Sequence, residues 1–350
     1  MHKVKVGVIG CGKIAQQVHI PNYIQNPRSK LSAISDSNKE TLTNISLKYG
    51  IEHTFENYEE MLDSGLVEAV SVCVPTGFHS DVVIKAARKG VHVLCEKPLA
   101  PSLGEADEML KAVAENKIKF SVGYNLRFLQ NHVKVKEYLE SGKIGQPIIA
   151  RANLVTTGPY AADEKSFARE TKKRIGCLFD SGAHIADLML WMFGEPLSLS
   201  ASFSTHMAGV QVDDAAMVSI KFKSGLLGEI SVAWVPIFSY AALETSRQIQ
   251  IIGAKGTIDS DIFGPSFQFY SPNSMICKLK GKVKLTPTEF DPRNPAEGLN
   301  KSYAKEIDSF LESVARDKNP AISGEEARQS LKLILAAYES GKSGTTISLS

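Results

Sequence analysis

The sequence lacks any run of about 18 apolar residues, the length that a membrane-spanning helix needs. Residues 1–6 lead directly into a strand pattern, with none of the apolar core and small-residue cleavage site of a signal peptide. An excess of one charge is also missing, because 40 Lys and Arg residues are interspersed with 38 Asp and Glu residues for a net charge of +2. We therefore expect a cytoplasmic protein that binds neither membranes nor nucleic acid.

Cysteine is scarce, and its spacing forms no pattern. The five cysteines are odd in number and widely separated, and the chain has neither a CxxC motif nor a cluster of Cys and His residues. This argues against a disulfide framework and against a structural zinc site, and we expect no bound metal. The predicted state is a set of reduced thiols in apolar surroundings: Cys11, Cys73, Cys95, Cys177 and Cys277.

Length and hydrophobic pattern favour two domains, because 350 residues exceed what one compact core usually holds. The first part alternates short apolar runs with helix-period segments, which is typical of a parallel sheet covered by helices on both faces. Near residue 124 the pattern changes, so we predict domains of residues 1–124 and 125–350. The predicted strands of the first domain are residues 4–9, 31–35, 69–74, 91–95 and 120–122, and its helices are residues 39–49, 80–89 and 103–115.

The second part reads as a largely antiparallel sheet. Residues 216–222 alternate apolar and polar side chains, and a turn at residues 223–225 leads into a second apolar segment at 226–234, which predicts a hairpin. Residues 248–252 form another alternating strand. Helices at 181–191 and 303–316 are predicted to cover one face of this sheet, and the other face is open to a neighbouring subunit. The predicted fold class is α/β, an N-terminal Rossmann domain with a C-terminal α/β domain whose sheet is open and mainly antiparallel.

The pattern Gly10-x-Gly12-x-x-Ala15 follows the first strand and opens a helix. Gly10 permits the tight turn, Gly12 lets the backbone approach a pyrophosphate, and Ala15 allows close packing of helix on strand. Amide groups at the helix N-terminus, at Lys13 and Ile14, would receive the phosphates. The context predicts a dinucleotide site.

Asp36 lies 21 residues after Ala15, at the end of the second predicted strand, and Ser37 follows it. At this place a carboxylate accepts hydrogen bonds from the ribose hydroxyls of NAD and repels the 2′-phosphate of NADP, so we expect NAD rather than NADP. The alternative is that Asp36 caps the helix that starts near Asn38.

Three loops leave the carboxyl ends of predicted strands, at residues 74–79, 96–98 and 123–127, and ligands bind at such ends. Lys97 directly follows an apolar strand, so its ammonium is expected to reach a cleft where it contacts a substrate oxygen. The alternative is a surface lysine paired with Glu96.

Asp180 and His184 are four residues apart and would share one face of a helix that begins near Ser181. The positive end of the helix would keep His184 neutral and able to accept a proton. Two alternatives stay open: Asp180 is an N-cap that serves the backbone, and His184 forms a buried pair with Asp187.

Taken together, these motifs resemble the glucose-fructose oxidoreductase/inositol dehydrogenase family (Gfo/Idh/MocA), over nearly the whole chain. The remaining segments of the resemblance are Val74-Pro75-Thr76-x-x-His79, Glu96-Lys97-Pro98-Leu99-Ala100, Gly123-Tyr124-Asn125-x-Arg127-Phe128, Asp180-x-x-x-His184-x-x-Asp187-Leu188-x-x-Trp191 and Val212-Asp213-Asp214. The chain departs from the family at Lys173-Arg174-Ile175, where members often carry glycines. These charges indicate one of two things: a substrate that is phosphorylated or linked to a nucleotide, or only the solvated edge of a loop.

The resemblance implies roles for individual residues. Lys97 would polarise the reacting hydroxyl or carbonyl, His184 would be the general acid and base, Asp180 would position substrate and His184, and Arg127 would contact substrate. Further residues would lie along the cofactor with Lys97: Val74, Pro75, Thr76, His79, Glu96 and Asn125.

The resemblance also implies an activity and an assembly. It predicts an NAD(H)-dependent oxidoreductase that transfers hydride between nicotinamide and a carbon of a sugar, cyclitol or sugar derivative, and that forms homodimers or homotetramers. Within the family the alternatives are an NAD-dependent glycosidase and a non-catalytic NAD-binding regulator. The presence of Lys97, Asp180 and His184 argues against the regulator, which has no need of proton-transfer groups.

Overall fold

The computed structural model describes residues 3–158, 176–206, 212–235, 247–264, 266–271, 283–285 and 295–349. The chain forms two compact units. The first holds Met1–Asn125 and Asn300–Leu331, and the second holds Leu126–Leu299 and Lys332–Ser350. Within the described residues, no helix combines the length and apolar character needed to cross a membrane.

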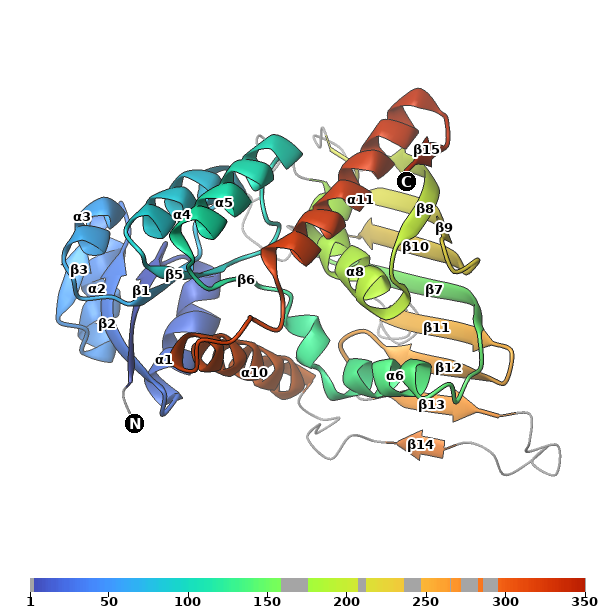
Figure 1. The fold of residues 1–350 in the computed structure, drawn as a ribbon, viewed down its shortest axis with the longest axis horizontal. Helices are drawn as coiled ribbons and strands as arrows, with labels where there is room; N and C mark the ends of the chain where they lie inside the picture. Colours follow the sequence, from blue (N-terminus) through green and yellow to red (C-terminus); the bar gives the residue numbers. More distant parts are fainter. Residues whose placement is uncertain are drawn as a thin grey trace. The chain divides into compact units, whose positions relative to one another are not determined.

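The first unit is built on a six-stranded sheet with the order β3-β2-β1-β4-β5-β6 (Figure 1). Every neighbouring pair is parallel, and this order, which reverses direction at the first strand, is that of a Rossmann fold. The predicted parallel sheet is therefore confirmed. Its strands are β1 (Val4–Ile9), β2 (Ser29–Ser35), β3 (His53–Phe55), β4 (Ala69–Val72), β5 (His92–Cys95) and β6 (Phe120–Val122).

Helices connect these strands, and their ends follow local signals. The predicted helix at 39–49 is present as α2 (Lys39–Tyr49), with Asn38 as its N-cap and Gly50 in the left-handed conformation at its end. The other helices along this part of the chain are η1 (Ala15–His19), α1 (Ile20–Gln25), α3 (Tyr58–Asp63), η2 (Thr76–Phe78), α4 (His79–Arg88), α5 (Leu103–Asn116) and η3 (Asn125–Phe128).

Helix α10 (Pro295–Ala315) corrects the expectation for residues 303–316. We expected this helix to cover the antiparallel sheet, and that expectation is wrong. Ile307, Phe310 and Leu311 are buried in the core of the first unit, in one cluster with Val4 and Val6 of β1. An amphipathic pattern shows which face of a helix is buried but not which sheet covers it.

The second unit is built on a nine-stranded sheet with the order β14-β13-β12-β11-β7-β10-β9-β8-β15. The predicted hairpin is present as β9 and β10, and the described neighbours pair antiparallel except β7 with β10. The sheet is therefore mainly antiparallel, as predicted. The strands are β7 (Pro147–Thr156), β8 (Pro196–Ser204), β9 (Ala215–Phe222), β10 (Leu227–Trp234), β11 (Arg247–Gly253), β12 (Gly256–Asp261), β13 (Phe267–Tyr270), β14 (Val283–Leu285) and β15 (Ile347–Ser348).

One face of this sheet carries the helices α6 (Gln130–Glu140) and α8 (Cys177–Phe193) (Figure 1). Along β9, Val218 and Ile220 face the core, whereas Met217 and Lys221 are exposed on the opposite face. Helix α8 packs on β10, and a Cβ at Gly182 would lie 2.7 Å from Leu178 of the same helix and 3.5 Å from Val232 of β10. The chain ends with α11 (Gly324–Ser343) and β15.

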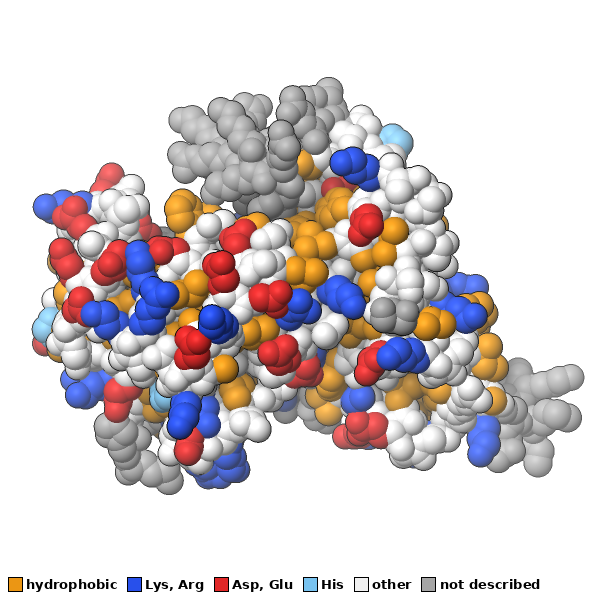
Figure 2. Space-filling view, turned by 45° about the horizontal axis from the view of Figure 1, so that its top comes forward, with side chains coloured by type: hydrophobic (Ala, Val, Ile, Leu, Met, Phe, Trp, Pro, Cys, Tyr) orange, Lys and Arg blue, Asp and Glu red, His pale blue; other side chains and the backbone are white. Residues whose placement is uncertain are grey.

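Charged groups and thiols follow the expectations from composition. Lys and Arg side chains are interspersed with Asp and Glu side chains over the face drawn in Figure 2. Four cysteines are buried free thiols, as predicted: Cys11, Cys73, Cys95 and Cys177. Cys277 lies outside the described residues.

Candidate active site

The turn after β1 has the geometry that the glycine pattern predicts. Gly10 has a φ of +86°, and a Cβ there would lie 2.8 Å from the backbone of Cys73 and Val74, so only glycine fits. At Gly12 a Cβ would meet no atom of the described residues within 4 Å, which leaves the loop open to a ligand. Ala15 is fully buried where the helix begins.

Asp36 faces this turn from the end of β2. Its Oδ2 accepts the backbone N–H of Cys11 at 2.7 Å, and its Oδ1 accepts the N–H of Asn38 at 2.8 Å. The alternative role as helix cap is wrong, because Asn38 caps α2 by accepting the N–H of Thr41 at 2.9 Å. Each carboxylate oxygen has a second lone pair, with which it can accept a hydrogen bond from a ribose hydroxyl. The open glycine turn and this fixed carboxylate fit NAD.

Two further loops at the carboxyl edge of the sheet are joined by His79. This residue is buried, with Nε2 2.9 Å from the carbonyl oxygen of Val74 and Nδ1 3.0 Å from that of Pro98. Burial lowers the pKa of His79, which favours the neutral ring, and a neutral ring has one N–H with which to donate to one of these carbonyls. The ring is packed between the loop of Val74, Pro75 and Thr76 and the loop of Lys97.

Lys97 follows β5 and is half-buried. Its backbone N–H donates to Oε2 of Glu96 at 3.2 Å. Glu96 is only 8 % exposed, so its carboxylate lies in the interior and not at the surface. The carboxylate of Glu96 lies 2.8 Å from Nε2 of His19, a residue that the sequence analysis missed. A lone histidine on a helix behind the glycine turn carries no pattern that would have marked it.

Asn125 is also buried, and its Nδ2 donates to Oγ of Ser302 at 2.9 Å. Its Oδ1 is a buried oxygen for which no described residue provides a hydrogen-bond donor. Such atoms are rare in folded proteins and indicate a place where a ligand or water binds.

In the second unit, Asp180 and His184 lie in the first two turns of α8, and both are partly exposed. The helix begins at Cys177, four residues before the predicted start near Ser181. Asp180 is therefore inside the first turn, and the alternative in which it is the N-cap is wrong. His184 lies beyond the first turn, where the influence of the helix dipole is weak.

Asp213 provides the cap that α8 needs. Its Oδ2 accepts the N–H of Leu178 at 3.0 Å, its carbonyl accepts the N–H of Cys177 at 2.8 Å, and Tyr338 donates to its Oδ1 at 2.9 Å. A Cβ at Gly176 would lie 1.7 Å from Oδ1 of Asp213, which excludes any side chain there. In the sequence, Asp213 is part of a motif of the family resemblance, but no local pattern indicates its capping role or its contact with Tyr338.

Arg127 and Asp187 form a buried ion pair in the same unit. Nε and Nη2 of Arg127 donate to the two carboxylate oxygens of Asp187 at 2.8 and 2.7 Å. The two side chains are 6 % and 1 % exposed, and the guanidinium also lies over the ring of Trp191. This bidentate geometry anchors Arg127 to α8. The variant segment Lys173-Arg174-Ile175 lies outside the described residues.

Two family models cover most of the chain. The model described as an oxidoreductase family with an NAD-binding Rossmann fold matches residues 4–124, and the GFO/IDH/MocA C-terminal domain matches residues 132–259. The chain belongs to the Gfo/Idh/MocA oxidoreductase family. Membership confirms the resemblance read from the motifs, and this Gfo/Idh/MocA protein is an NAD-dependent oxidoreductase that acts on CH–OH groups.

Its relatives act on cyclitols and sugars. The chain is 28 % identical to myo-inositol 2-dehydrogenase of Thermotoga maritima, over 96 % of each chain. It is 25 % identical to scyllo-inositol 2-dehydrogenase (NAD(+)) of Bacillus subtilis, over 99 % of this chain and 97 % of that one. A levoglucosan dehydrogenase solved with NADH and levoglucosan shares the fold, with a TM-score of 0.86, 22 % identity and coverage of 99 % of this chain and all of the other.

Proposed function

We propose that this protein transfers hydride between NAD and one carbon of a cyclitol or sugar, oxidising a hydroxyl or reducing the corresponding carbonyl. The proposal rests on the start of α8, where two proton-handling groups, Asp180 and His184, are partly exposed while the other residues of the first two turns, except Ser181, are buried. A carboxylate and an imidazole on one helix face are suited to binding a hydroxyl and taking its proton.

We assign the roles as follows. Bound NAD supplies the hydride acceptor, and His184 takes the hydroxyl proton during oxidation. The ammonium of Lys97 stabilises charge on the reacting oxygen, and Asp180 orients substrate and His184. Arg127 is the fourth proposed substrate-binding residue. Two of its guanidinium nitrogens already donate to Asp187, so it has fewer donors left for a substrate. The proposed cofactor-binding residues are Gly10, Gly12, Lys13, Ile14, Asp36, Ser37, Val74, Pro75, Thr76, His79, Glu96, Lys97 and Asn125.

A substrate panel tests this function. Purified protein is incubated with NAD or NADP and with myo-inositol, scyllo-inositol, levoglucosan, common hexoses and their phosphates, and reduced nicotinamide is followed by absorbance. We expect NADH formation with at least one unphosphorylated polyol. Release of product from glycosides without net NADH would instead establish a glycosidase, and NADH binding without turnover of any compound would favour a regulator.

Cofactor choice depends on Asp36. Its carboxylate is fixed beside the glycine turn and would face the 2′-phosphate of NADP, whereas Lys39, the nearest cation along the chain, is exposed and paired with Glu56 at 3.4 Å. We expect NAD to be preferred over NADP by at least about tenfold in kcat/KM, which is about 1.4 kcal/mol. Asp36→Ala combined with Ser37→Arg should remove or reverse this preference, and Glu40→Ala on the exposed start of α2 should not. Equal use of both cofactors by the unaltered protein would contradict the assignment of Asp36.

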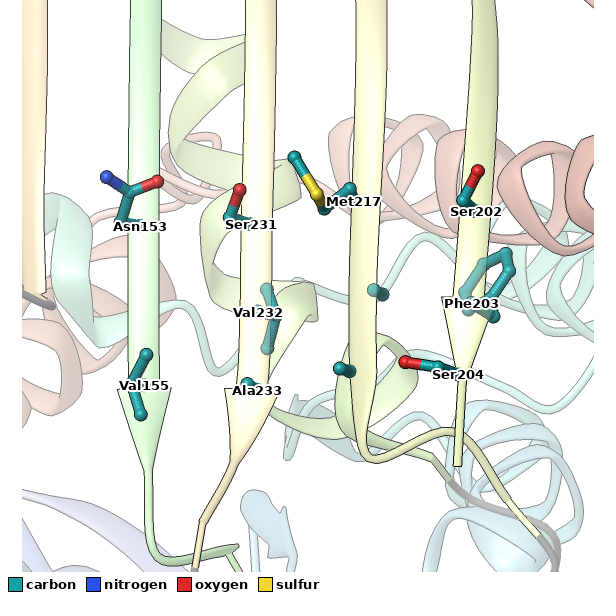
Figure 3. A pocket seen from close by; sticks show the side chains of 11 residues that line it. Asn153, Val155, Ser202, Phe203, Ser204, Met217, Ser231, Val232 and Ala233 are labelled. Carbon is teal, nitrogen blue, oxygen red and sulfur yellow. The ribbon is translucent and has the colours of Figure 1, made fainter. Parts of the chain in front are cut away.

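We propose that the open face of the nine-stranded sheet joins copies of this chain into homodimers or homotetramers. This face carries a depression of about 490 Å³ across β7, β8, β9 and β10 (Figure 3). Val155, Ala233 and Met217 line it with a few small polar side chains, and Met217 is 58 % exposed. Large exposed apolar side chains on a sheet face favour association.

The mass in solution tests this assembly. Light scattering coupled to gel filtration should give two or four times the chain mass, and Met217→Asp should shift it toward one chain, because two copies of the new carboxylate would be buried together. Lys301→Asp changes charge on α10 of the first unit and should leave the mass unchanged. A monomer at micromolar concentration would contradict the proposal.

We also propose that the protein resides in the cytoplasm and binds no nucleic acid. The four described cysteines are buried free thiols, which suits a reducing compartment. The mixed charges of the face in Figure 2 offer no basic stripe for a phosphate backbone.

A further inference from the structure

Four buried side chains of the first unit form a line that ends at Glu96. Tyr23 OH lies 2.6 Å from Oγ of Ser71, Ser71 Oγ lies 3.0 Å from Nδ1 of His19, and His19 Nε2 lies 2.8 Å from Oε1 of Glu96. Tyr23, Ser71 and His19 are fully buried. They come from α1, β4 and the π-helical turn η1, and His19 of η1 makes the contact with the carboxylate of Glu96.

The end of this line at Glu96 has a defined donor. A carboxylate only accepts, so His19 Nε2 carries the proton in its hydrogen bond to Glu96. The hydroxyl of Ser71 can donate or accept, and it therefore bridges Tyr23 and Nδ1 of His19. The three contacts form an unbroken series in the interior, and hydrogen bonds in such a series strengthen one another.

Glu96 connects His19 to the backbone of Lys97. While Oε1 is held by His19, Oε2 accepts the backbone N–H of Lys97. Gly123 lies beside the carboxylate, where a Cβ would come within 3.3 to 3.4 Å of the carboxylate atoms, so a residue without a side chain leaves space for Glu96 in this position. On the other side of Lys97, Nδ1 of the buried His79 lies 3.0 Å from the carbonyl oxygen of Pro98. Buried imidazoles therefore lie against the chain on both sides of Lys97.

We propose that His19 is a positioning residue that, through Glu96, fixes the backbone of Lys97 and so the placement of its ammonium. The inference rests on the catalytic role proposed for Lys97. His19 ends the helical turn that begins at Ala15, directly after the glycine turn. The same short segment therefore shapes the nucleotide loop and holds the lysine, which keeps Lys97 in register with the cofactor. Displacement of a reacting group by about 1 Å costs up to about 100-fold in rate.

Three substitutions test the line with NAD and myo-inositol, or with the panel compound that is turned over fastest. His19→Phe removes the contacts of the ring with Ser71 and Glu96, and His19→Gln keeps a donor that can reach Glu96. Ser71→Ala removes the hydroxyl that contacts His19, with little change in volume. We expect His19→Phe to lower kcat by about 10- to 100-fold and Ser71→Ala by about threefold or more, with the Kd for NADH within about threefold of the unaltered protein. His19→Gln should recover at least about fivefold over His19→Phe.

His92→Gln is the matched control, because His92 lies at the opposite end of β5 and accepts the N–H of Lys119 at 3.0 Å. It should leave kcat unchanged. Equal kcat for the two His19 variants, or a kcat for Ser71→Ala like that of the unaltered protein, would overturn the inference. If His19→Phe does not fold, a kcat for Ser71→Ala below that of His92→Gln supports the inference, and equal values overturn it.

Lys97→Ala distinguishes the two proposals. If it retains full turnover, the catalytic role of Lys97 fails, whatever the His19 variants do. If it loses turnover while the His19 and Ser71 variants keep theirs, the positioning inference alone is wrong.

Discussion

Lys97→Ala is expected to lower turnover by about 100-fold or more while NADH binding changes little. Lys97 follows β5 at the carboxyl edge of the sheet, is half-buried, and has its backbone held by Glu96. Loss of a positioned cation removes stabilisation of charge on the reacting oxygen, which a flexible surface lysine cannot replace. Steady-state kinetics with the substrate found in the panel give kcat, and quenching of NADH fluorescence gives the Kd.

Lys111→Ala provides the control for this measurement, because Lys111 is an exposed lysine of α5 in the same unit. It should behave like the unaltered protein. Full turnover of Lys97→Ala on the true substrate would remove Lys97 from the mechanism.

His184→Gln is expected to lose most of the oxidation rate and, with it, the dependence of that rate on low pH. In the unaltered protein, protonation of His184 as the pH falls removes the acceptor for the hydroxyl proton, so the oxidation rate should decline on the acid side. Glutamine keeps a hydrogen-bonding side chain of similar length but cannot take up a proton in this range. The residual rate of the variant should therefore be flat where the unaltered enzyme declines.

A pH series of kcat/KM for both proteins provides the comparison. His53→Gln, which replaces an exposed histidine of β3, should retain the acid limb. An acid limb that persists in His184→Gln would show that another group titrates.

The elements with local signals were predicted to within a residue or two. Helix α2 spans the predicted residues 39–49, and its ends depend on Asn38 and Gly50, because a cap and a left-handed glycine act on the adjacent turn alone. The β9–β10 hairpin followed from alternation and a short turn for the same reason. Most motifs of the candidate site could be read in this way, since each loop directly follows a strand.

Elements that depend on distant partners were predicted less well. Helix α8 begins four residues earlier than expected because its first N–H groups are capped by Asp213, 35 residues away from Leu178. The apolar face of α10 was recognised, but its burial against β1 depends on how the chain returns to the first unit.

The dinucleotide turn, the alternation of strands and helices, and the residue types that carry the proposed chemistry could be predicted without the structure, because these features depend on periodicity and on neighbours along the chain. The tertiary structure alone decided the parallel pairing of β7 with β10 and the polar groups that meet in the interior. His19 meets Ser71 and Glu96 across 52 and 77 residues, and Tyr338 meets Asp213 across 125. Any buried polar side chain needs a partner, but which one it finds depends on the packing of elements, and no local pattern encodes that choice.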